Sequence, residues 1–587
     1  MVKKLRILIV LIFTFANCLP GQEQTTIRGW NVLSDRFEDD MVTIAASKSY
    51  NINHLQLSHD LIMDLQEIRE PKRQKLVNSL IDEAHKAGIK EVVIWDHALY
   101  NLKYYPDQFK TGPNATIDLD NPAFWDWFKK DYREMLKLVP KVDGLVLTFI
   151  ETGARAENQY SEKLKTGAEK LAAVVDAVAA VVCDELGKQL YIRTFAYTDA
   201  EYKNTIGCIG HIKSNKIVLM MKETPHDFFL THPNDKYAGT INRPTLMEFD
   251  ACNEFNGQGI IANTWPDYII RRWSELIKRP NVIGYVARTD RYGDTRLVGT
   301  PNEILLYTLK KYTEDQTISA DKIYDGFISE KYGKEAIRYL KPAFMMAYDI
   351  VSSSLYTLGT NISNHSKMDY DPYKSSYGRH VSGKWLDPPV VFVGHGVNKN
   401  FNYWTDIIEH LAPARFKTSE GALKEEAPVV IEKGWVTAEE KMDETFLKYI
   451  INEKAFGVKK AEKALKLIKK AKPVMNESSY DQVYNLFYRT LITARIYEAT
   501  ATSYFGYRIF ARGAGFQSGW VSTKIQKALE NMLTIADEID NYKEEVPRGQ
   551  WNWRGDSETA RKYYKLITET GWKEYGNAVF KYKIPGK

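Results

Sequence analysis

Three acidic side chains follow apolar runs at the points where buried strands are expected to end. Glu151 ends the run DGLVLTFIE, Asp227 comes after KIVLMM, and Glu254 ends TLMEFDACNE. Hydrolysis of a glycosidic bond needs one carboxylic acid to protonate the leaving oxygen and one carboxylate to activate water. We therefore interpret these residues as candidate catalytic groups, with a solvated loop acid as the alternative reading of each.

Two cations accompany them. Arg193 in YIRTFAY and Lys222 in MMKE lie within or at the end of apolar runs, where an unpaired charge is costly. Either they pair with the nearby carboxylates, or they hold an anionic group of a substrate, since arginine binds a carboxylate through two parallel hydrogen bonds. Both readings stay open at the level of the sequence.

Further polar or aromatic side chains occupy the same place relative to other apolar runs. Such residues are candidate ligand contacts because barrel enzymes build their sites from the C-terminal ends of their strands. The candidate substrate-binding residues are Trp30, His59, His97, Arg193, Tyr197, Lys222, His226 and Arg288.

The elements that would position these residues alternate regularly along the chain. Amphipathic segments with a period of 3.6, such as 73–88 and 169–187, separate eight short apolar runs. This alternation predicts an α/β fold, a (β/α)8 TIM-like barrel over residues 25–340. The eight runs cover residues 26–33, 53–59, 91–97, 143–151, 190–197, 216–223, 245–254 and 282–288.

The pattern changes after residue 340. Long helical stretches at 446–471 and 484–505 predict a mainly α-helical C-terminal domain over residues 341–587. A loop-rich segment, 358–415, carries His365, His380, Trp385, His395 and Trp404, and a long loop of this kind is often functional.

The first residues, MVKKLRILIVLIFTFANC, combine a basic start with a short apolar run, which predicts a signal peptide over residues 1–24. Removing Lys3, Lys4 and Arg6 with it lowers the formal charge from +5 to about +2, which gives no case for nucleic acid. Cys18 matches a bacterial lipoprotein site loosely, with Asn17 in place of a small residue, so plain export and lipid anchoring both stay open. We expect an exported bacterial protein, either periplasmic or anchored in the outer membrane.

Four motifs in order resemble those of the α-glucuronidases of glycoside hydrolase family 67. LTFIETG resembles the strand end that carries the family's catalytic acid, and YIRTFAY resembles its IWR-x-F-x-Y pattern. MKETPHDF resembles Q-x-K-N-G-P-x-D-F, and MEFDACNEFNGQ resembles M-E-x-Q-x-x-Q-E-Y-x-G-Q. An early H-W-D-N of the family is similar to RGWNVL, and the resemblance extends over roughly residues 26 to 340.

The resemblance implies a role for each matched residue. Glu151 would be the general acid, while Asp227 and Glu254 would position and deprotonate water. Arg193 and Lys222 would hold the carboxylate of a uronic acid, and Trp30 would stack on a sugar ring.

The sequence departs from the family in three places. The family's N-terminal β domain is missing, the loop after the acid becomes ETGARAENQ, and the region of a later W-T-G-H motif becomes RTDRYGDTR. The added arginines, Arg155, Arg291 and Arg296 beside Arg288, would suit a sulfated or polyanionic oligosaccharide, or else lie on a solvated surface.

Three functions are therefore considered. The leading one is an exo-acting glycosidase that removes a non-reducing-end uronic acid from an acidic oligosaccharide, with no metal or cofactor. The second is an oligosaccharide dehydratase, in which His59, His97, Tyr197 or His226 would serve as base near C5 and acid near O4 of the uronate. The third is a non-catalytic sugar-binding barrel. An acidic oligosaccharide is the expected partner, and a homodimer stays open.

Overall fold

The computed structural model describes residues 26–196, 199–225, 227–230, 232–357, 360–361, 363, 365–368, 443–511, 519–570 and 580. The predicted signal peptide with Cys18 lies outside these residues. So do Tyr197, His226 and most of the loop-rich segment 358–415, including His380, Trp385, His395 and Trp404.

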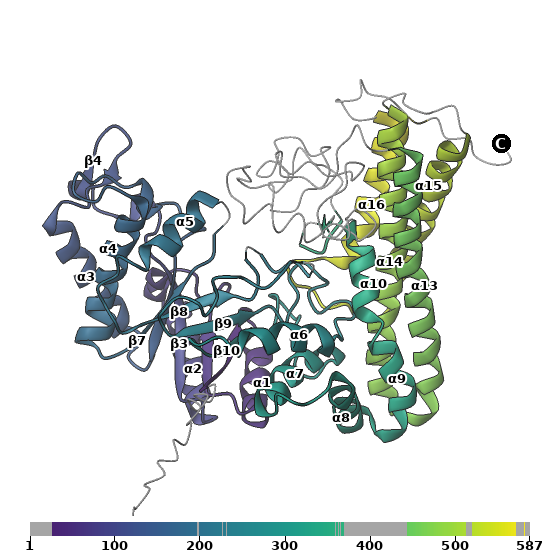
Figure 1. Cartoon of the computed structure of the whole chain (residues 1–587), viewed down its shortest axis with the longest axis horizontal. Helices are drawn as coiled ribbons and strands as arrows, with labels where there is room; N and C mark the ends of the chain where they lie inside the picture. The colour runs from purple at the N-terminus through teal and green to yellow at the C-terminus, as the bar shows by residue number, and fades with distance from the viewer. Residues whose placement is uncertain are drawn as a thin grey trace, which may run out of the picture.

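Eight parallel strands close into a barrel, which confirms the predicted fold (Figure 1). Neighbours around the barrel follow the order β1, β2, β3, β6, β7, β8, β9, β10, and β10 pairs again with β1. The strands are β1 (Ile27–Val32), β2 (His54–Leu57), β3 (Glu91–His97), β6 (Gly144–Thr148), β7 (Gln189–Arg193), β8 (Ile217–Lys222), β9 (Thr245–Phe249) and β10 (Val282–Arg288). Two antiparallel ribbons lie outside the barrel, β4 (Lys110–Thr111) with β5 (Thr116–Ile117), and β11 (Tyr356–Thr357) with β12 (Thr360–Asn361).

Helices connect the strands, and several of them begin at a side-chain cap. Glu70 accepts hydrogen bonds from two backbone amides at the start of α2, and Thr166 forms a capping box with Glu169 at the start of α4. The connecting helices are α1 (Phe37–Ser47), α2 (Pro71–Lys86), α3 (Pro122–Lys137), α4 (Gly167–Ala179), α5 (Asp199–Cys208), α6 (Pro266–Leu276) and α7 (Ile304–Glu314).

The lumen of the barrel is filled by side chains from alternate positions of the strands, as the period of two requires. They form a separate apolar cluster made of Val93, Trp95, Val146, Tyr191, Val218, Met220, Leu246 and Val286.

A chain of hydrogen bonds runs up the lumen beneath Trp95. Glu91 accepts from His54 Nδ1 (2.8 Å), His54 Nε2 lies 3.0 Å from the amide of Gln56, and Trp95 Nε1 donates to Gln56 Oε1 (3.0 Å). The indole of Trp95 is therefore fixed as the floor of the barrel's C-terminal end.

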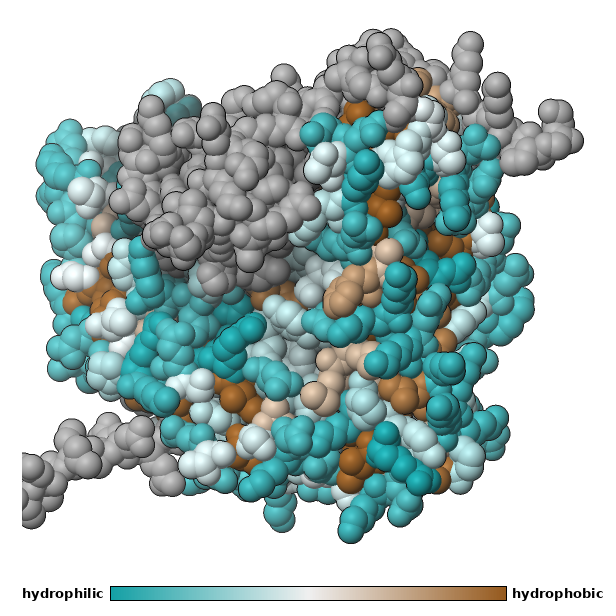
Figure 2. All heavy atoms as spheres, turned by 45° about the vertical axis from the view of Figure 1, so that its right-hand side comes forward, coloured by the Kyte–Doolittle hydropathy of each residue, from teal (hydrophilic) through white to brown (hydrophobic). Residues whose placement is uncertain are grey.

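Helices follow the barrel and include three long ones that pack side by side (Figure 1). They are α8 (Ala320–Tyr332), α9 (Ile337–Phe344), α10 (Ala347–Ser354), α13 (Glu444–Ala471), α14 (Glu477–Ala511), α15 (Gly519–Asp540) and α16 (Asp556–Lys565). The predicted domain boundary at residue 340 falls inside α9, and the division there stays a prediction. Among the described helices, none is both long enough and apolar enough to span a bilayer. Figure 2 shows that the visible face is mostly hydrophilic, with hydrophobic residues scattered over it.

Candidate active site at the barrel mouth

The C-terminal ends of the strands carry a ring of inward-facing polar side chains, called the barrel mouth below. Arg193 on β7 is in register with Thr148 on β6, which is in register with His97 on β3. On the other side, Arg288 on β10 is in register with Asn31 on β1. Register partners on parallel strands share a face. The ring consists of Asn31, Ser58, His97, Thr148, Arg193, Lys222, Glu248 and Arg288.

One half of this ring is joined by buried ion pairs into a continuous chain. Arg193 donates from Nε to Glu248 Oε2 (2.7 Å) and from Nη2 to Oε1 (3.3 Å). Arg288 bridges Glu248 (Nε–Oε1 3.0 Å) and Glu254 (Nη1–Oε2 3.0 Å), and Arg291 donates from Nη2 to Glu254. We call these five residues the ion-pair chain.

The carboxylates of the ion-pair chain are held in their ionised form. Burial opposes ionisation of Glu248, but Arg193, Arg288 and Lys222 outweigh it and lower its pKa to about 2. Burial also opposes ionisation of Glu254, and there Arg291, a hydrogen bond from His365 and Arg288 keep the pKa well below its usual range. A carboxylate with so low a pKa orients its neighbours well but is a weak proton acceptor.

Lys222 forms a separate pair at the next strand end. Its ammonium donates to Asp227 Oδ1 (2.7 Å) and lies over the rings of Phe195 (3.4 Å) and Phe228 (4.3 Å). Burial lowers the pKa of Lys222, and Asp227 opposes that shift. The cation is therefore fixed by one carboxylate and two aromatic faces.

These contacts bear on the prediction that Arg193 and Lys222 hold the carboxylate of a uronic acid. Arg193 and Lys222 are both paired with carboxylates of the protein itself, which is the alternative reading of the two cations. A direct role for either in binding substrate stays a prediction. Glu248 was missed, although a lone acid inside the apolar run TLMEF, in phase with the lumen residue Leu246, was a usable signal.

His59 lies close to the arginines of the ion-pair chain and contacts the rings of Trp95 and Tyr292. Its ring is 4.9 Å from Trp95 and 5.7 Å from Tyr292, centroid to centroid, and Nδ1 lies 2.8 Å from Ser58 Oγ. Burial, followed by Arg288, Arg291 and Arg193, lowers the pKa of His59 well below its ordinary value. These effects favour the uncharged imidazole, the form that can act as a base, and they also make that base a weak one.

His97 lies in the opposite half of the ring in a different environment. Its Nδ1 is 2.6 Å from Asp64 Oδ1, while its Nε2 is buried and has no hydrogen-bond partner among the described residues. Burial alone would lower the pKa of His97, but Asp64, Asp96 and Glu151 raise it above its ordinary value. The ring is therefore suited to donate a proton.

Glu151 is exposed and lies near enough to His97 to influence its charge. It stands in the loop three residues beyond β6, which ends at Thr148, so its predicted place as the last residue of the strand was wrong. Its backbone is left-handed, with φ 67°, an uncommon conformation for a residue other than glycine. Backbone strain of this kind often marks functional positions.

Glu254 is also in a loop, five residues beyond the end of β9 at Phe249, which corrects its expected position in the strand. Its carboxylate is buried, and His365 Nε2 lies 3.4 Å from Oε1. His365 stacks on Phe255 at 4.9 Å, and the neighbouring Ser366 donates to the backbone oxygen of Glu254 (3.0 Å). Residues beyond the barrel thus complete the surroundings of Glu254.

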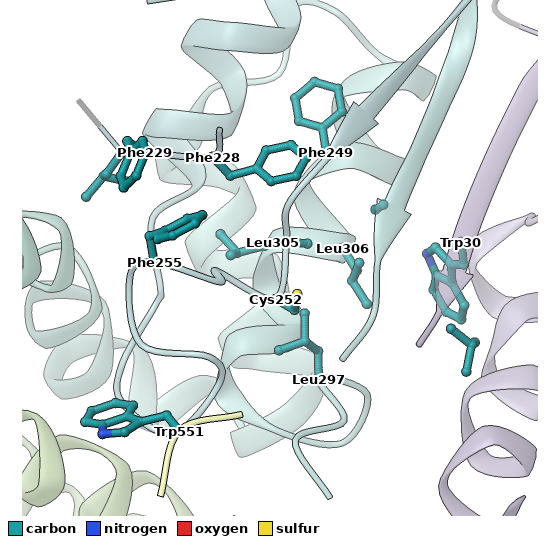
Figure 3. Packing of buried hydrophobic residues seen from close by; sticks show 14 of the residues in the cluster. Trp30, Phe228, Phe229, Phe249, Cys252, Phe255, Leu297, Leu305, Leu306 and Trp551 are labelled. Atoms are coloured by element: carbon teal, nitrogen blue, oxygen red, sulfur yellow. The ribbon is translucent and has the colours of Figure 1, made fainter. Parts of the chain in front are cut away.

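A second segment from the helical part reaches the same loop. Gln550 accepts from Arg291 Nε (3.1 Å), and Trp551 N donates to Gln258 Oε1 (2.8 Å). Figure 3 shows Trp551, on the yellow C-terminal segment, below the loop that carries Phe255. The backbones touch here, because a side chain at Gly549 would meet the carbonyl of Arg291 at 2.2 Å.

Trp30 does not lie at the mouth. It is 1% exposed and packs against Tyr50, 5.0 Å between ring centroids, within the main hydrophobic core (Figure 3). Its neighbour Asn31 faces inward, so strand alternation directs Trp30 outward toward the helices. The prediction that Trp30 stacks on a sugar ring was therefore wrong.

Two of the added arginines are engaged away from the ion-pair chain. Arg155 pairs with Glu201 (2.8 Å) and with Glu157, and Arg296 pairs with Asp39 (2.5 Å). Of these arginines, Arg288 and Arg291 belong to the ion-pair chain. The described residues contain no group of three or more His, Cys, Asp or Glu side chains placed to hold a metal ion.

No protein-family model matches this chain, and no curated protein matches it. Its structural neighbours are glycoside hydrolases. One is a GH138 enzyme that targets pectin rhamnogalacturonan II, with a TM-score of 0.58 and 12% identity over 93% of this chain and 68% of that chain. Another is a GH115 4-O-methyl-α-glucuronidase with specificity for decorated arabinogalactans, with a TM-score of 0.44 and 9% identity over 92% of this chain and 62% of that chain.

At these identities the likeness shows the fold. The chain therefore shares with the GH138 enzyme a barrel architecture, while membership of family 67 stays a prediction.

Proposed function

We propose that this protein is a glycoside hydrolase that removes a uronic acid from the non-reducing end of an acidic oligosaccharide. The observation that carries the proposal is the cationic half of the barrel mouth, where ion pairs connect four cations to three carboxylates. These are Arg193, Lys222, Arg288 and Arg291, with Glu248, Asp227 and Glu254. A site of this sign favours an anionic ligand.

In this proposal the proton donor is Glu151. It would protonate the glycosidic oxygen while the bond from C1 to that oxygen breaks, and a carboxylate across the ring would take a proton from the attacking water. Asp227 and Glu254 are the candidates for the second role. Asp227 fits it better, because among the described residues Lys222 is the one cation paired with it, whereas two arginines and His365 hold the carboxylate of Glu254.

A dehydratase is the second candidate, and the two histidines favour it. Neutral His59 could take the proton from C5 of a uronate, and His97 could protonate O4, which leaves as water while a C4–C5 double bond forms. This elimination needs one unprotonated group that acts as the base and one protonated group that acts as the acid. The lowered pKa of His59 and the raised pKa of His97 provide that contrast.

One experiment tests both candidates. Uronate-ended oligosaccharides are incubated with the protein, and the products are measured by mass and by ultraviolet absorbance. Hydrolysis splits the chain with gain of one water, whereas dehydration leaves it intact, lighter by one water and newly absorbing. An unchanged substrate at high protein concentration, together with measurable binding, would instead support a sugar-binding barrel.

A further inference from the structure

Some polar side-chain atoms of the barrel mouth have hydrogen-bond partners within the protein, and others have none among the described residues. Three members of the ring, together with Arg291, each carry a buried polar atom that has no hydrogen-bond partner among the described residues. The residues that carry them are each at most 4% exposed. The atoms are Asn31 Nδ2, His97 Nε2, Thr148 Oγ1 and Arg291 Nη1.

Arg291 is the charged member of this set. Its Nε is held by Gln550 and its Nη2 by Glu254, so the plane of the guanidinium is fixed, and the group lies 4.5 Å from the ring of Tyr292. Within the described part of the chain, Nη1 has no acceptor. A buried charged donor without a partner bears a desolvation cost that a bound anion would remove.

The other cations of the mouth differ from Arg291 in this respect. Arg193 donates to both oxygens of Glu248, Lys222 donates to Asp227, and Arg288 donates to Glu248 and Glu254. None of these three has a buried nitrogen without a partner in the described residues.

The position of Arg291 suits a ligand at the mouth. Tyr292 lies between it and His59, whose ring contacts that of Trp95 at the floor of the site in a tilted arrangement. Arg291 is also one of the charges that lower the pKa of His59, so the two side chains share one electrostatic environment.

We infer that Arg291, and not Arg193 or Lys222, binds the carboxylate of the substrate's uronic acid. The inference rests on the proposed function and deepens it. Nη1 and the remaining N–H of Nη2 present a planar fork that matches a carboxylate. Asn31, His97 and Thr148 lie at strand ends on the inward face of the barrel, each with a buried polar atom that has no partner among the described residues, and in this inference they bind the hydroxyls of the ring. Arg193 and Lys222 form the framework that keeps the strand ends in place.

The test is a binding measurement with glucuronate and with methyl glucoside as its neutral counterpart, by ligand-observed NMR, in a Glu151→Gln background that prevents turnover. Arg291→Gln should weaken glucuronate about 10- to 150-fold, the range expected for a lost charge-assisted hydrogen bond, and leave the glucoside unchanged. Arg291→Lys keeps a positive charge beside Glu254, so it protects folding while removing the fork. Arg296→Gln, in the same loop but paired with Asp39, is the matched control and should change neither ligand.

Three outcomes are distinguishable. Loss of the preference for glucuronate in both Arg291 variants, with the control unchanged, supports the inference. Retention of the preference in folded Arg291 variants and its loss in Arg193→Gln overturns the assignment while leaving the proposed function intact. Equal binding of both sugars by the background protein overturns the uronate substrate, and the inference with it.

Discussion

Arg193 and Glu248 form a two-point ion pair across the C-terminal end of the barrel, with Nε–Oε2 at 2.7 Å and Nη2–Oε1 at 3.3 Å. Both side chains are nearly inaccessible to solvent, 2% and 0% exposed. The guanidinium also lies 4.8 Å from the ring of Trp95 and 4.9 Å from that of Phe195. A charge pair so enclosed depends on both partners, because removing one leaves the other buried and uncompensated.

Glu248→Gln should therefore destabilise the protein by about 3–5 kcal/mol, the cost of breaking a buried pair. Chemical denaturation monitored by fluorescence measures the change. The matched control is Glu185→Gln, which removes the exposed pair with Arg133 and should cost less than about 1 kcal/mol. Similar losses in the two variants would show that Glu248 is not essential to the framework.

Glu151→Gln should reduce turnover by about 10²–10⁴-fold with little change in substrate binding, since the amide cannot supply a proton. The loss should shrink for substrates whose leaving group needs no protonation. Glu157→Gln, in the same loop and paired with Arg155, should retain activity. Steady-state kinetics on oligosaccharides and on an activated aryl glycoside separate these cases, and full activity of Glu151→Gln would rule it out as the acid.

Asp64→Asn should move the alkaline limb of the pH–rate profile toward lower pH. Burial acts against the charged form of His97, but Asp64 raises its pKa, so His97 stays protonated to higher pH while Asp64 is present. If His97 is the proton donor, activity falls as pH rises through that pKa, and removing Asp64 lowers the pH of the fall. Asp143→Asn alters the His85 pair elsewhere in the barrel and should leave the profile unchanged.

Trp30→Ala should cost about 3–5 kcal/mol in folding free energy, as for other large-to-small changes in a core. Trp30→Phe should be milder, and its KM should equal that of the unmodified protein, because the ring packs on Tyr50 and not on a sugar. Thermal unfolding and KM are the two measurements. A raised KM in a stable Trp30→Phe protein would contradict the core assignment.

Stability should fall as pH rises from about 4 toward 9 because of Asp40. Burial, followed by Asp290 and other nearby acids, raises its pKa from 3.8 to about 9. Between these values the folded state holds a proton that the unfolded state has released, so unfolding becomes more favourable by up to about 1.4 kcal/mol per pH unit. Asp40→Asn should flatten this slope in urea titrations, whereas Asp126→Asn, on the exposed face of α3, should not.

The sequence predicted the barrel because each strand is an apolar run bounded by polar residues. It also predicted that Arg193 and Lys222 are buried charges at strand ends. The alternation of inward and outward side chains along a strand could have identified Glu248 as an inward-facing residue. It could also have excluded Trp30 from the barrel mouth, because the side chain of its neighbour Asn31 points inward.

Other parts of the site lay beyond prediction from local patterns. His365 and Gln550 reach Glu254 and Arg291 from positions more than 100 residues away in the chain, and no spacing rule connects them. The loops after β6 and β9 were read as parts of strands, since FIE and DACNE follow the apolar runs directly, with no glycine or proline to mark where each strand ends.

The contacts from the helical part have a consequence for how this protein can be divided. Gln550 fixes one edge of Arg291, His365 touches Glu254, and the backbone at Gly549 lies against that of Arg291. An excised barrel would keep every strand and lose the outer wall of its own charged cluster. The segments that join the C-terminal helices are therefore part of the site, and neither portion of the chain would keep the chemistry of the site if it were transferred to another protein.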